Sequence, residues 1–263
     1  NITSLSLHAL NYLFSQTYKT HLAHLTCLVE THKTNTIQTK STLNNFKRKA
    51  VINPATPTSA KGSHGGELIA FNPDINLSAI NKDILNNTTI HTSQPLNFAV
   101  AIIRLRGLSC LIFTAYFYVS EKMSERNHNI FRQIQLVASH FKLPFIIIAD
   151  FNMHKQDILD TSWIAELDAV IITPKTPTTI NSASNRVIDY VIISKSIQFL
   201  IKDIIMDFKT PWGPHYGLWI ALYNSPLLIT GQVLCKPRPL PIQEFNNVWS
   251  ALNDYQKLQK IRK

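Results

Sequence analysis

The chain has 263 residues, 45% of them hydrophobic, and its 26 Lys and Arg outnumber its 16 Asp and Glu for a formal net charge of +10. This length supports one large domain or two small ones, and the hydrophobic content excludes a chain that is disordered for most of its length. With only 7 glycines, a collagen-like or flexible-linker protein is also excluded. The charge indicates either an anionic partner, such as nucleic acid or a membrane surface, or simply a soluble protein with a basic surface.

The first predicted elements are a helix and a short strand. Apolar residues at helical spacing follow Leu5, and the apolar run 25–29 predicts a strand that ends at Glu30. Between Glu30 and Glu67 there are six Lys or Arg residues and no acidic residue. This basic block, which includes Lys47, Arg48 and Lys49, predicts either a solvated loop or a surface that contacts phosphate groups.

The middle of the chain predicts strands around one long helix. Two glycines, Gly65 and Gly66, mark a turn that leads into a strand. Helical spacing predicts a helix that Pro144 stops, and a wholly apolar run of the fully buried type follows it. The expected strands are 67–71, 98–103, 109–118 and 145–149, and the helix is 121–141.

The last third predicts a helix at 158–166 and strands at 169–172, 187–194 and 218–223. Because strands outnumber helices and the two are mixed, we expect an α/β or α+β domain with packed sheets over residues 1–223. A basic, proline-rich stretch at 236–241 begins the C-terminal part, and residues 224–263 are predicted to be a linker and a polar tail.

Three sparse cysteines without a CxxC pair argue against a disulfide framework and a structural zinc site. The spacing of His21, His24 and His32 matches no zinc motif. We therefore expect an intracellular, reducing environment. No apolar run is long enough to predict a membrane span, and the start has neither Met nor the features of a signal peptide. The sequence is thus expected to begin inside a longer reading frame.

Polar side chains of catalytic type stand where the predicted strands end. Such positions are favoured for catalytic groups because a rigid element holds them beside a loop. Each residue taken alone also has a structural explanation as a turn, ion-pair or core residue. In chain order, the residues are Glu30, Tyr116, Asp150, Asn152, Asp189 and His215.

In this order, the motifs resemble those of the endonuclease/exonuclease/phosphatase superfamily, a group of metal-dependent phosphodiesterases. The resemblance covers about residues 1–223, and its details are most similar to the endonucleases of non-LTR retrotransposons and to abasic-site endonucleases. The matching segments are Val29-Glu30-Thr31-His32, Gly65-Gly66-Glu67, Ala115-Tyr116-Phe117, Ala149-Asp150-Phe151-Asn152-Met153, Ile188-Asp189-Tyr190 and Gly213-Pro214-His215.

The resemblance implies a four-layer α/β sandwich of two packed mixed sheets with outer helices. It also implies that Glu30 is the principal ligand of Mg²⁺, or of Mn²⁺, with Asn1 at the position of the family's first-strand Asn. Asp150 would orient or deprotonate the attacking water, with Asn152 holding that geometry. Asp189 would pair with His215 to stabilise the transition state, and Tyr116 would donate a hydrogen bond to the phosphate or the leaving oxygen.

One departure affects the functional interpretation. The family has Ser-Asp-His where this chain has Gly213-Pro214-His215, so a carboxylate is missing. The segment at the place of the family's Gly-Gly-Val is Gly65-Gly66-Glu67, and Glu67 is expected near Glu30, Asp150 and Asp189 around one cleft. We predict a Mg²⁺-dependent endonuclease that nicks DNA, with a weakened or inactive nucleic-acid-binding remnant as the alternative. Phosphoinositides, sphingomyelin and poly(A) are rival substrates within the superfamily, but the basic block favours a nucleic acid backbone.

Two further expectations concern context and geometry. The chain is expected to belong to a longer polyprotein with a reverse transcriptase, to have no membrane partner, and to be nuclear if it acts on chromosomal DNA. The functional groups of Glu30, Asp150, Asn152 and His215 should line one cleft within about 10 Å of a common point, the space for one cation and a phosphate.

Overall fold

The computed structural model describes residues 1–2, 4–15, 23–58, 62–88, 96–105, 107–180 and 186–223. The predicted linker and tail, residues 224–263, lie outside the described residues. Among the described helices, none combines the length and the apolar character that a membrane crossing requires.

A six-stranded mixed sheet forms the centre of the fold, with the strand order β10-β11-β9-β8-β7-β6. Strands β8 and β9 are parallel, and every other neighbouring pair in this sheet is antiparallel. The strands are β6 (Leu77–Ala79), β7 (Phe98–Leu105), β8 (Leu108–Tyr116), β9 (Phe145–Asp150), β10 (Ala169–Ile172) and β11 (Asp189–Ser194).

A second, antiparallel sheet has the order β1-β5-β2, and two strand pairs accompany it. In the pair β12–β13, Ile204 and Ile220 pack against the same apolar cluster as Ile69 of β5. The strands are β1 (Leu25–Leu28), β2 (Lys49–Asn53), β5 (Glu67–Phe71), β12 (Ile201–Asp207) and β13 (Gly217–Leu222), and the short pair is β3 (Thr56–Pro57) with β4 (Ser63–His64).

Several of the described helices begin at a residue whose side chain caps them. The side chains of Ser6, Asn35 and Ser124 each accept a hydrogen bond from a main-chain N–H of the first turn, which satisfies a donor that the helix itself leaves unpaired. The helices are α1 (Leu7–Phe14), α2 (Thr36–Asn45), α3 (Lys82–Thr88), α4 (Glu125–Phe141), α5 (Lys155–Leu159), α6 (Trp163–Glu166) and the 3₁₀ helix η1 (Lys195–Leu200).

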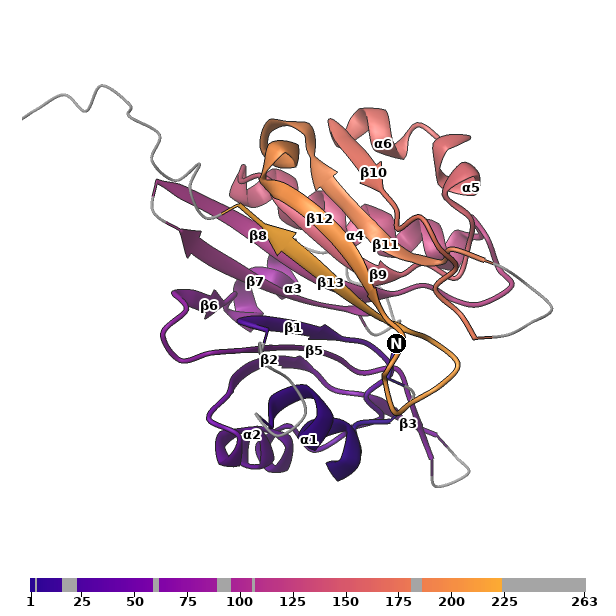
Figure 1. Ribbon diagram of the computed structural model, residues 1–263. Coiled ribbons are helices and arrows are strands. Elements are labelled where there is room, and N and C mark those ends of the chain that lie inside the picture. The colour runs from indigo at the N-terminus through magenta and orange to yellow at the C-terminus, as the bar shows by residue number, and fades with distance from the viewer. Residues whose placement is uncertain are drawn as a thin grey trace, which may run out of the picture. The chain divides into compact units, whose positions relative to one another are not determined.

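Alternation along the strands divides the apolar residues among three cores, and these cores define four layers. In β9, Ile147 packs toward α4, whereas Ile146 points to the space between the sheets. In β5, Ile69 enters that same space, whereas Leu68 packs against α1 and α2. Figure 1 shows α1 and α2 on the outer face of the β1-β5-β2 sheet. This four-layer α/β arrangement confirms the fold class expected from the motifs.

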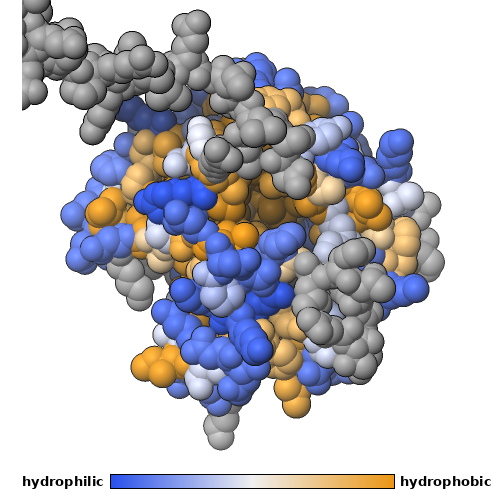
Figure 2. Space-filling view, turned by 60° about the vertical axis from the view of Figure 1, so that its left-hand side comes forward, coloured by the Kyte–Doolittle hydropathy of each residue, from blue (hydrophilic) through white to orange (hydrophobic). Residues whose placement is uncertain are grey.

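The described surface is largely polar, but its apolar side chains are not evenly spread. Figure 2 shows hydrophilic residues over much of one face and hydrophobic residues gathered around a hollow. The exposed large hydrophobic residues include Ile205 in β12, Leu222 at the end of β13 and Tyr223 just after it.

One interpretation and one element prediction do not hold. Of the two interpretations of the basic block, the continuous solvated loop is excluded, because the block contains α2 and β2. Residues 158–166 do not form one helix either: α5 ends at Leu159, and Ser162 starts the separate short helix α6. By contrast, the strand at 67–71 has the predicted bounds.

Candidate active site

Three of the predicted residues lie side by side in the six-stranded sheet. Asp150 in β9 is the Cα partner of Tyr116 in β8 and of Asp189 in β11. All three lie on the same strand face as residues such as Ile146 and Val191, which fill the space between the sheets. The Asp189–Asp150–Tyr116 row therefore faces that space at one edge of the sheet.

His215 is held beside the row by Asp189. Its Nδ1 lies 2.8 Å from Oδ2 of Asp189, and its Nε2 lies 3.6 Å from Oδ2 of Asp150. His215 is 6% exposed and Asp189 5% exposed, so water does not screen this contact strongly. A proton on Nδ1 donates to Asp189, and this contact fixes the ring with Nε2 facing Asp150.

The segment that carries His215 is anchored by Thr178, which is fully buried. The Thr178 hydroxyl accepts hydrogen bonds from the main-chain N–H groups of Ile188 (3.1 Å) and Asp189 (3.2 Å), and its carbonyl accepts one from Tyr216 (2.9 Å). Thr178 thus holds the two partners of the Asp189–His215 contact together. The sequence analysis did not identify this residue, because a single threonine in a loop has no distinguishing pattern.

Asp150 is 1% exposed and receives several contacts. Asn1 Nδ2 donates to its Oδ2 over 3.0 Å, and the main-chain N–H of Asn152 donates to its Oδ1 over 3.1 Å. Burial, together with the negative charge of Asp189, raises the pKa of Asp150 to about 6. Asp150 is therefore mostly ionised at neutral pH, yet it holds a proton more readily than an exposed aspartate.

Asn152 adopts a left-handed backbone conformation, with φ of 52°. Asparagine tolerates this region better than most residues, which accounts for its place in the turn after β9. Its side-chain amide donates to the carbonyl of Phe117 over 2.9 Å. The turn after β9 is thereby fixed to the turn after β8.

Tyr116 connects the row to Glu30. Burial, the negative charges of Glu30 and Asp150, and a hydrogen bond to Glu30 all raise the pKa of Tyr116 above its usual value of 10.0. Its phenol therefore stays protonated at neutral pH and serves as a hydrogen-bond donor.

The turn that contains Glu30, residues 30–32, is held by unusual backbone geometry. Both Glu30 (φ 59°) and His32 (φ 55°) are left-handed, and the N–H groups of Thr31 and His32 donate to the carbonyls of Gly66 and Gly65. A Cβ on Gly66 would lie 2.7 Å from Oγ1 of Thr31, so only glycine fits there. We refer to residues 30–32 as the Glu30 turn.

A second carboxyl lies behind this turn. Glu67 is 2% exposed, and its Oε2 accepts a hydrogen bond from Nδ2 of Asn53 over 2.6 Å. Burial raises the pKa of Glu67 to about 8; the charge of Glu30 adds to this effect, and the Asn53 hydrogen bond opposes it.

The donor chemistry beside Glu30 fits a hard divalent cation. The Glu30 side chain is partly exposed and offers carboxylate oxygens, the ligands that Mg²⁺ prefers. Next to it, Oγ1 of Thr31 is buried and has no hydrogen-bond partner among the described residues. Asp150, Asp189 and His215 form a second group that could hold a metal, since one ligand atom from each lies within 4.8 Å of the others.

The basic run divides into two kinds of residue. Lys47 and Lys49 are exposed, but Arg48 is 5% exposed and its guanidinium lies 5.2 Å from the centre of the Phe14 ring. The prediction that Arg48 contacts phosphate groups does not fit this burial. Exposure alternates along the run: Lys49, the first residue of β2, is exposed, whereas the side chain of Arg48 just before it points into the protein.

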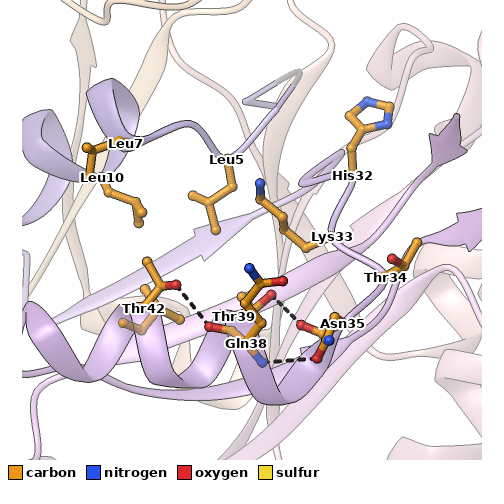
Figure 3. Close-up of a pocket in the computed structure, with 11 residues that line it drawn as sticks. Leu5, Leu7, Leu10, His32, Lys33, Thr34, Asn35, Gln38, Thr39 and Thr42 are labelled. Atoms are coloured by element: carbon orange, nitrogen blue, oxygen red, sulfur yellow. Dashed lines mark hydrogen bonds between the residues drawn. The ribbon is translucent and has the colours of Figure 1, made fainter.

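The described chain also has a pocket of about 260 Å³ away from the row. Figure 3 shows it between the start of α1 and α2, with Leu5 and Leu10 on one side and Gln38 and Thr42 on the other. The pocket approaches the candidate site through His32, whose Nε2 lies 3.9 Å from Oε2 of Glu30. The pocket lies on the helix side of the β1-β5-β2 sheet, so it is not the space that the row faces.

No protein-family model matches the sequence, and no curated protein matches it either. Solved structures do match the fold. An abasic-site endonuclease from Leishmania major, LMAP, has a TM-score of 0.61 at 10% identity, over 84% of this chain and 85% of that one. The 3′ phosphatase NExo from Neisseria, bound to a product DNA hairpin, has a TM-score of 0.60 at 12% identity, over 85% and 97%. A mannosyl-6-phosphatase from Bacteroides thetaiotaomicron, Bt3783, has a TM-score of 0.53 at 11% identity, over 82% and 90%.

These matches show that the chain has the fold of the endonuclease/exonuclease/phosphatase superfamily, at low sequence identity. Within that fold, the described residues include a buried group of two aspartates and one histidine. The names of the similar structures refer to different phosphorylated compounds, so the fold alone does not specify the substrate.

Proposed function

We propose that the chain is a divalent-metal-dependent phosphodiesterase that nicks DNA, of the type found in retroelements. The observation that supports this most is the contact of His215 with Asp189 beside Asp150, in register with Tyr116. Hydrolysis of a phosphodiester needs a base for the attacking water, stabilisation of the charge that develops on the phosphoryl group, and a donor for the leaving oxygen.

The residues of the row can divide these tasks. Asp150, with its pKa near 6, accepts the proton of the attacking water, since the best general base titrates close to the working pH. Asp189 orients the His215 ring, whose Nε2–H then donates toward the phosphoryl oxygens. The protonated phenol of Tyr116 donates to the phosphate or to the leaving oxygen.

Glu30 is the residue that would hold the cation, with Asn1 as a second candidate ligand. A bound Mg²⁺ or Mn²⁺ would supply positive charge to the phosphoryl oxygens. The protein contributes the placement of Glu30, which the hydrogen bond from Tyr116 and the left-handed turn keep beside the row.

DNA is the proposed substrate because the chain carries an excess of ten positive charges and because two of the similar structures are named for enzymes of DNA. The retroelement type rests on the segments Asp150–Met153 and Pro211–His215, and it implies a neighbouring reverse transcriptase in the parent protein. Action on chromosomal DNA would place the protein in the nucleus.

A plasmid-nicking assay tests the proposal. Wild-type protein with Mg²⁺ should convert supercoiled plasmid to the open circle, and the double variant Asp150→Ala, His215→Ala should not. Asp168→Asn is a matched control, since it removes an exposed carboxylate that pairs with Lys195. If wild type and the double variant nick equally, the proposal is wrong.

Pro214 supports a second candidate, a remnant that binds nucleic acid without cutting it. It occupies the place of a family carboxylate next to His215, and its carbonyl accepts a hydrogen bond from the N–H of Ile180. The remnant should shift DNA in a gel at low salt but leave the plasmid supercoiled with either Mg²⁺ or Mn²⁺.

A further inference from the structure

Glu67 is a buried acid that the proposed chemistry does not use. It stands at the first position of β5, and its side chain lies on the same face as that of Ile69, which fills the space between the two sheets. The Asp189–Asp150–Tyr116 row faces the same space from the opposite sheet. Glu67 therefore enters the site region from the sheet that carries the Glu30 turn.

Hydrogen bonds place Glu67 at the same end of the sheets as the row. The amide of Asn53 donates both to Oε2 of Glu67 (2.6 Å) and to the carbonyl of Leu96 (2.5 Å). The next residue, Asn97, accepts a hydrogen bond at its carbonyl from the N–H of Tyr116 (3.0 Å). One amide thus connects Glu67 to the segment on which the end of β8 rests.

The Glu30 turn approaches Glu67 from the other side. The Thr31 N–H donates to the carbonyl of Gly66 over 3.0 Å, and Gly66 has no room for a side chain at this contact. The charge of Glu30 acts on the Glu67 carboxyl through space. The backbone segments that carry Glu30 and Glu67 are therefore joined directly at this junction.

Hydrogen-bond donors, but no cation, surround the carboxyl of Glu67. It accepts from Asn53 and from the main-chain N–H groups of Gly66 and Glu67. Among the described residues, no cationic side chain pairs with it. Because burial without a countercharge disfavours the ionised form, a divalent cation at this place would stabilise the carboxylate.

We propose that Glu67 is a second acidic group of the cation site at Glu30, and that it strengthens the binding of a divalent cation there. This inference rests on the proposed metal dependence and adds a residue that the family pattern does not supply, since the family has Val at this position. Mg²⁺ and Mn²⁺ retain several waters in proteins, so Glu67 can act directly or through a bound water.

The test is a titration of the protein with Mn²⁺ alone, without DNA. Calorimetry and the electron spin resonance signal of free Mn²⁺ both measure the affinity. Glu67→Gln should weaken Mn²⁺ binding by about 10- to 100-fold, the range typical of groups that support metal ligands. Glu30→Gln should weaken it at least as much. Asp203→Asn removes one exposed carboxylate from β12 and should change the affinity less than about twofold.

Folding is controlled separately. In Glu67→Gln, the oxygen of the new side-chain amide can still accept from Asn53, so the thermal midpoint of this variant should not fall. Glu67→Val, which restores the family residue, is the second variant, and it should weaken Mn²⁺ binding to the same degree as Glu67→Gln.

The outcomes separate this inference from the proposed function. Equal Mn²⁺ affinities of Glu67→Gln and Asp203→Asn would overturn the role of Glu67, even if the wild type nicks DNA. An absence of Mn²⁺ binding in the wild type would overturn it as well. Weakened binding in Glu67→Gln, together with a wild type that does not nick DNA, would support the cation site and contradict the nuclease.

Discussion

The two sides of the candidate site are held in different ways. The Asp189–Asp150–Tyr116 row lies on neighbouring strands, so the ladder hydrogen bonds of the six-stranded sheet set its spacing. The Glu30 turn has two left-handed residues and depends on the close approach of Gly66. The row is therefore as rigid as the sheet, whereas the turn keeps its shape only while its neighbours stay in place.

The largest effect is expected from the row. Asp150→Asn keeps the size of the side chain but removes the proton acceptor, so nicking should slow by about 10²- to 10⁴-fold. Single-turnover cleavage of a plasmid measures this change. Asp160→Asn is the control, because Asp160 is exposed and accepts from Gln156 within the α5 segment. Similar rates for the two variants would show that the row does not carry the chemistry.

The raised pKa of Asp150 also predicts how the free energy of unfolding of the wild type depends on pH. The pKa of Asp150 is raised from 3.8 to about 6, so the folded protein binds this proton more tightly than the unfolded chain. The resulting stabilisation is present in full below about pH 4 and is lost as the pH rises through 6, a change of about 3 kcal/mol.

Urea unfolding in EDTA between pH 4 and pH 8 checks this sign. The free energy of unfolding of the wild type should fall relative to that of Asp150→Asn as the pH rises, because the variant has no proton to lose. A constant difference between the two proteins across this range would contradict the raised pKa.

The Glu30 turn is tested by a pair of glycine variants. Gly66→Ala places a methyl group against Thr31 and Ala55 at a φ of 92°, and it should lower the free energy of unfolding by about 2–3 kcal/mol. Gly107→Ala has a similar φ of 81° but nothing within 4 Å, so it should cost only about 1 kcal/mol. Equal losses would mean that the close approach is not a constraint.

A smaller effect is expected where the chain departs from the family pattern. Pro214→Asp restores the missing carboxylate beside His215 and should raise the nicking rate about tenfold. Pro211→Asp adds the same charge at an exposed position three residues earlier. If both variants are as slow as the wild type, the loss at this position is not what limits the rate.

The smallest effects belong to the basic run. Lys47→Gln and Lys49→Gln should each reduce the salt dependence of DNA binding by about one unit of slope, measured by fluorescence anisotropy at several salt concentrations. Arg48→Gln should leave the slope unchanged and lower the thermal midpoint, because Arg48 is buried beside Phe14. A slope change for Arg48→Gln would contradict its interior position.

The sequence predicted best what the sheet determines. The apolar run of β9 and the polar residue at its end place Asp150 at a sheet edge, and the motif order placed Tyr116 and Asp189 beside it. In the structure, the register of the three strands makes these residues direct neighbours. Alternation and strand ends are visible in a single sequence, but the grouping of Tyr116 and Asp189 with Asp150 came from the resemblance to the family.

The sequence predicted poorly what depends on distant contacts. Helix α2 is mostly polar, and its position comes from Leu43, which packs under the β1-β5-β2 sheet. The burial of Arg48 depends on Phe14 of α1, which nothing in the basic run itself reveals. Thr178 was not assigned a role, because its partners come from another strand and another loop.

The register of the row also limits how the strands that carry it can change. A single residue inserted within β9 would turn Asp150 to the opposite face of the sheet. The connections are constrained as well, because Asn152 fixes the turn after β9 and Thr178 holds Asp189 beside the segment of His215. Changes of chain length are therefore excluded both from the strands of the row and from these two anchor points.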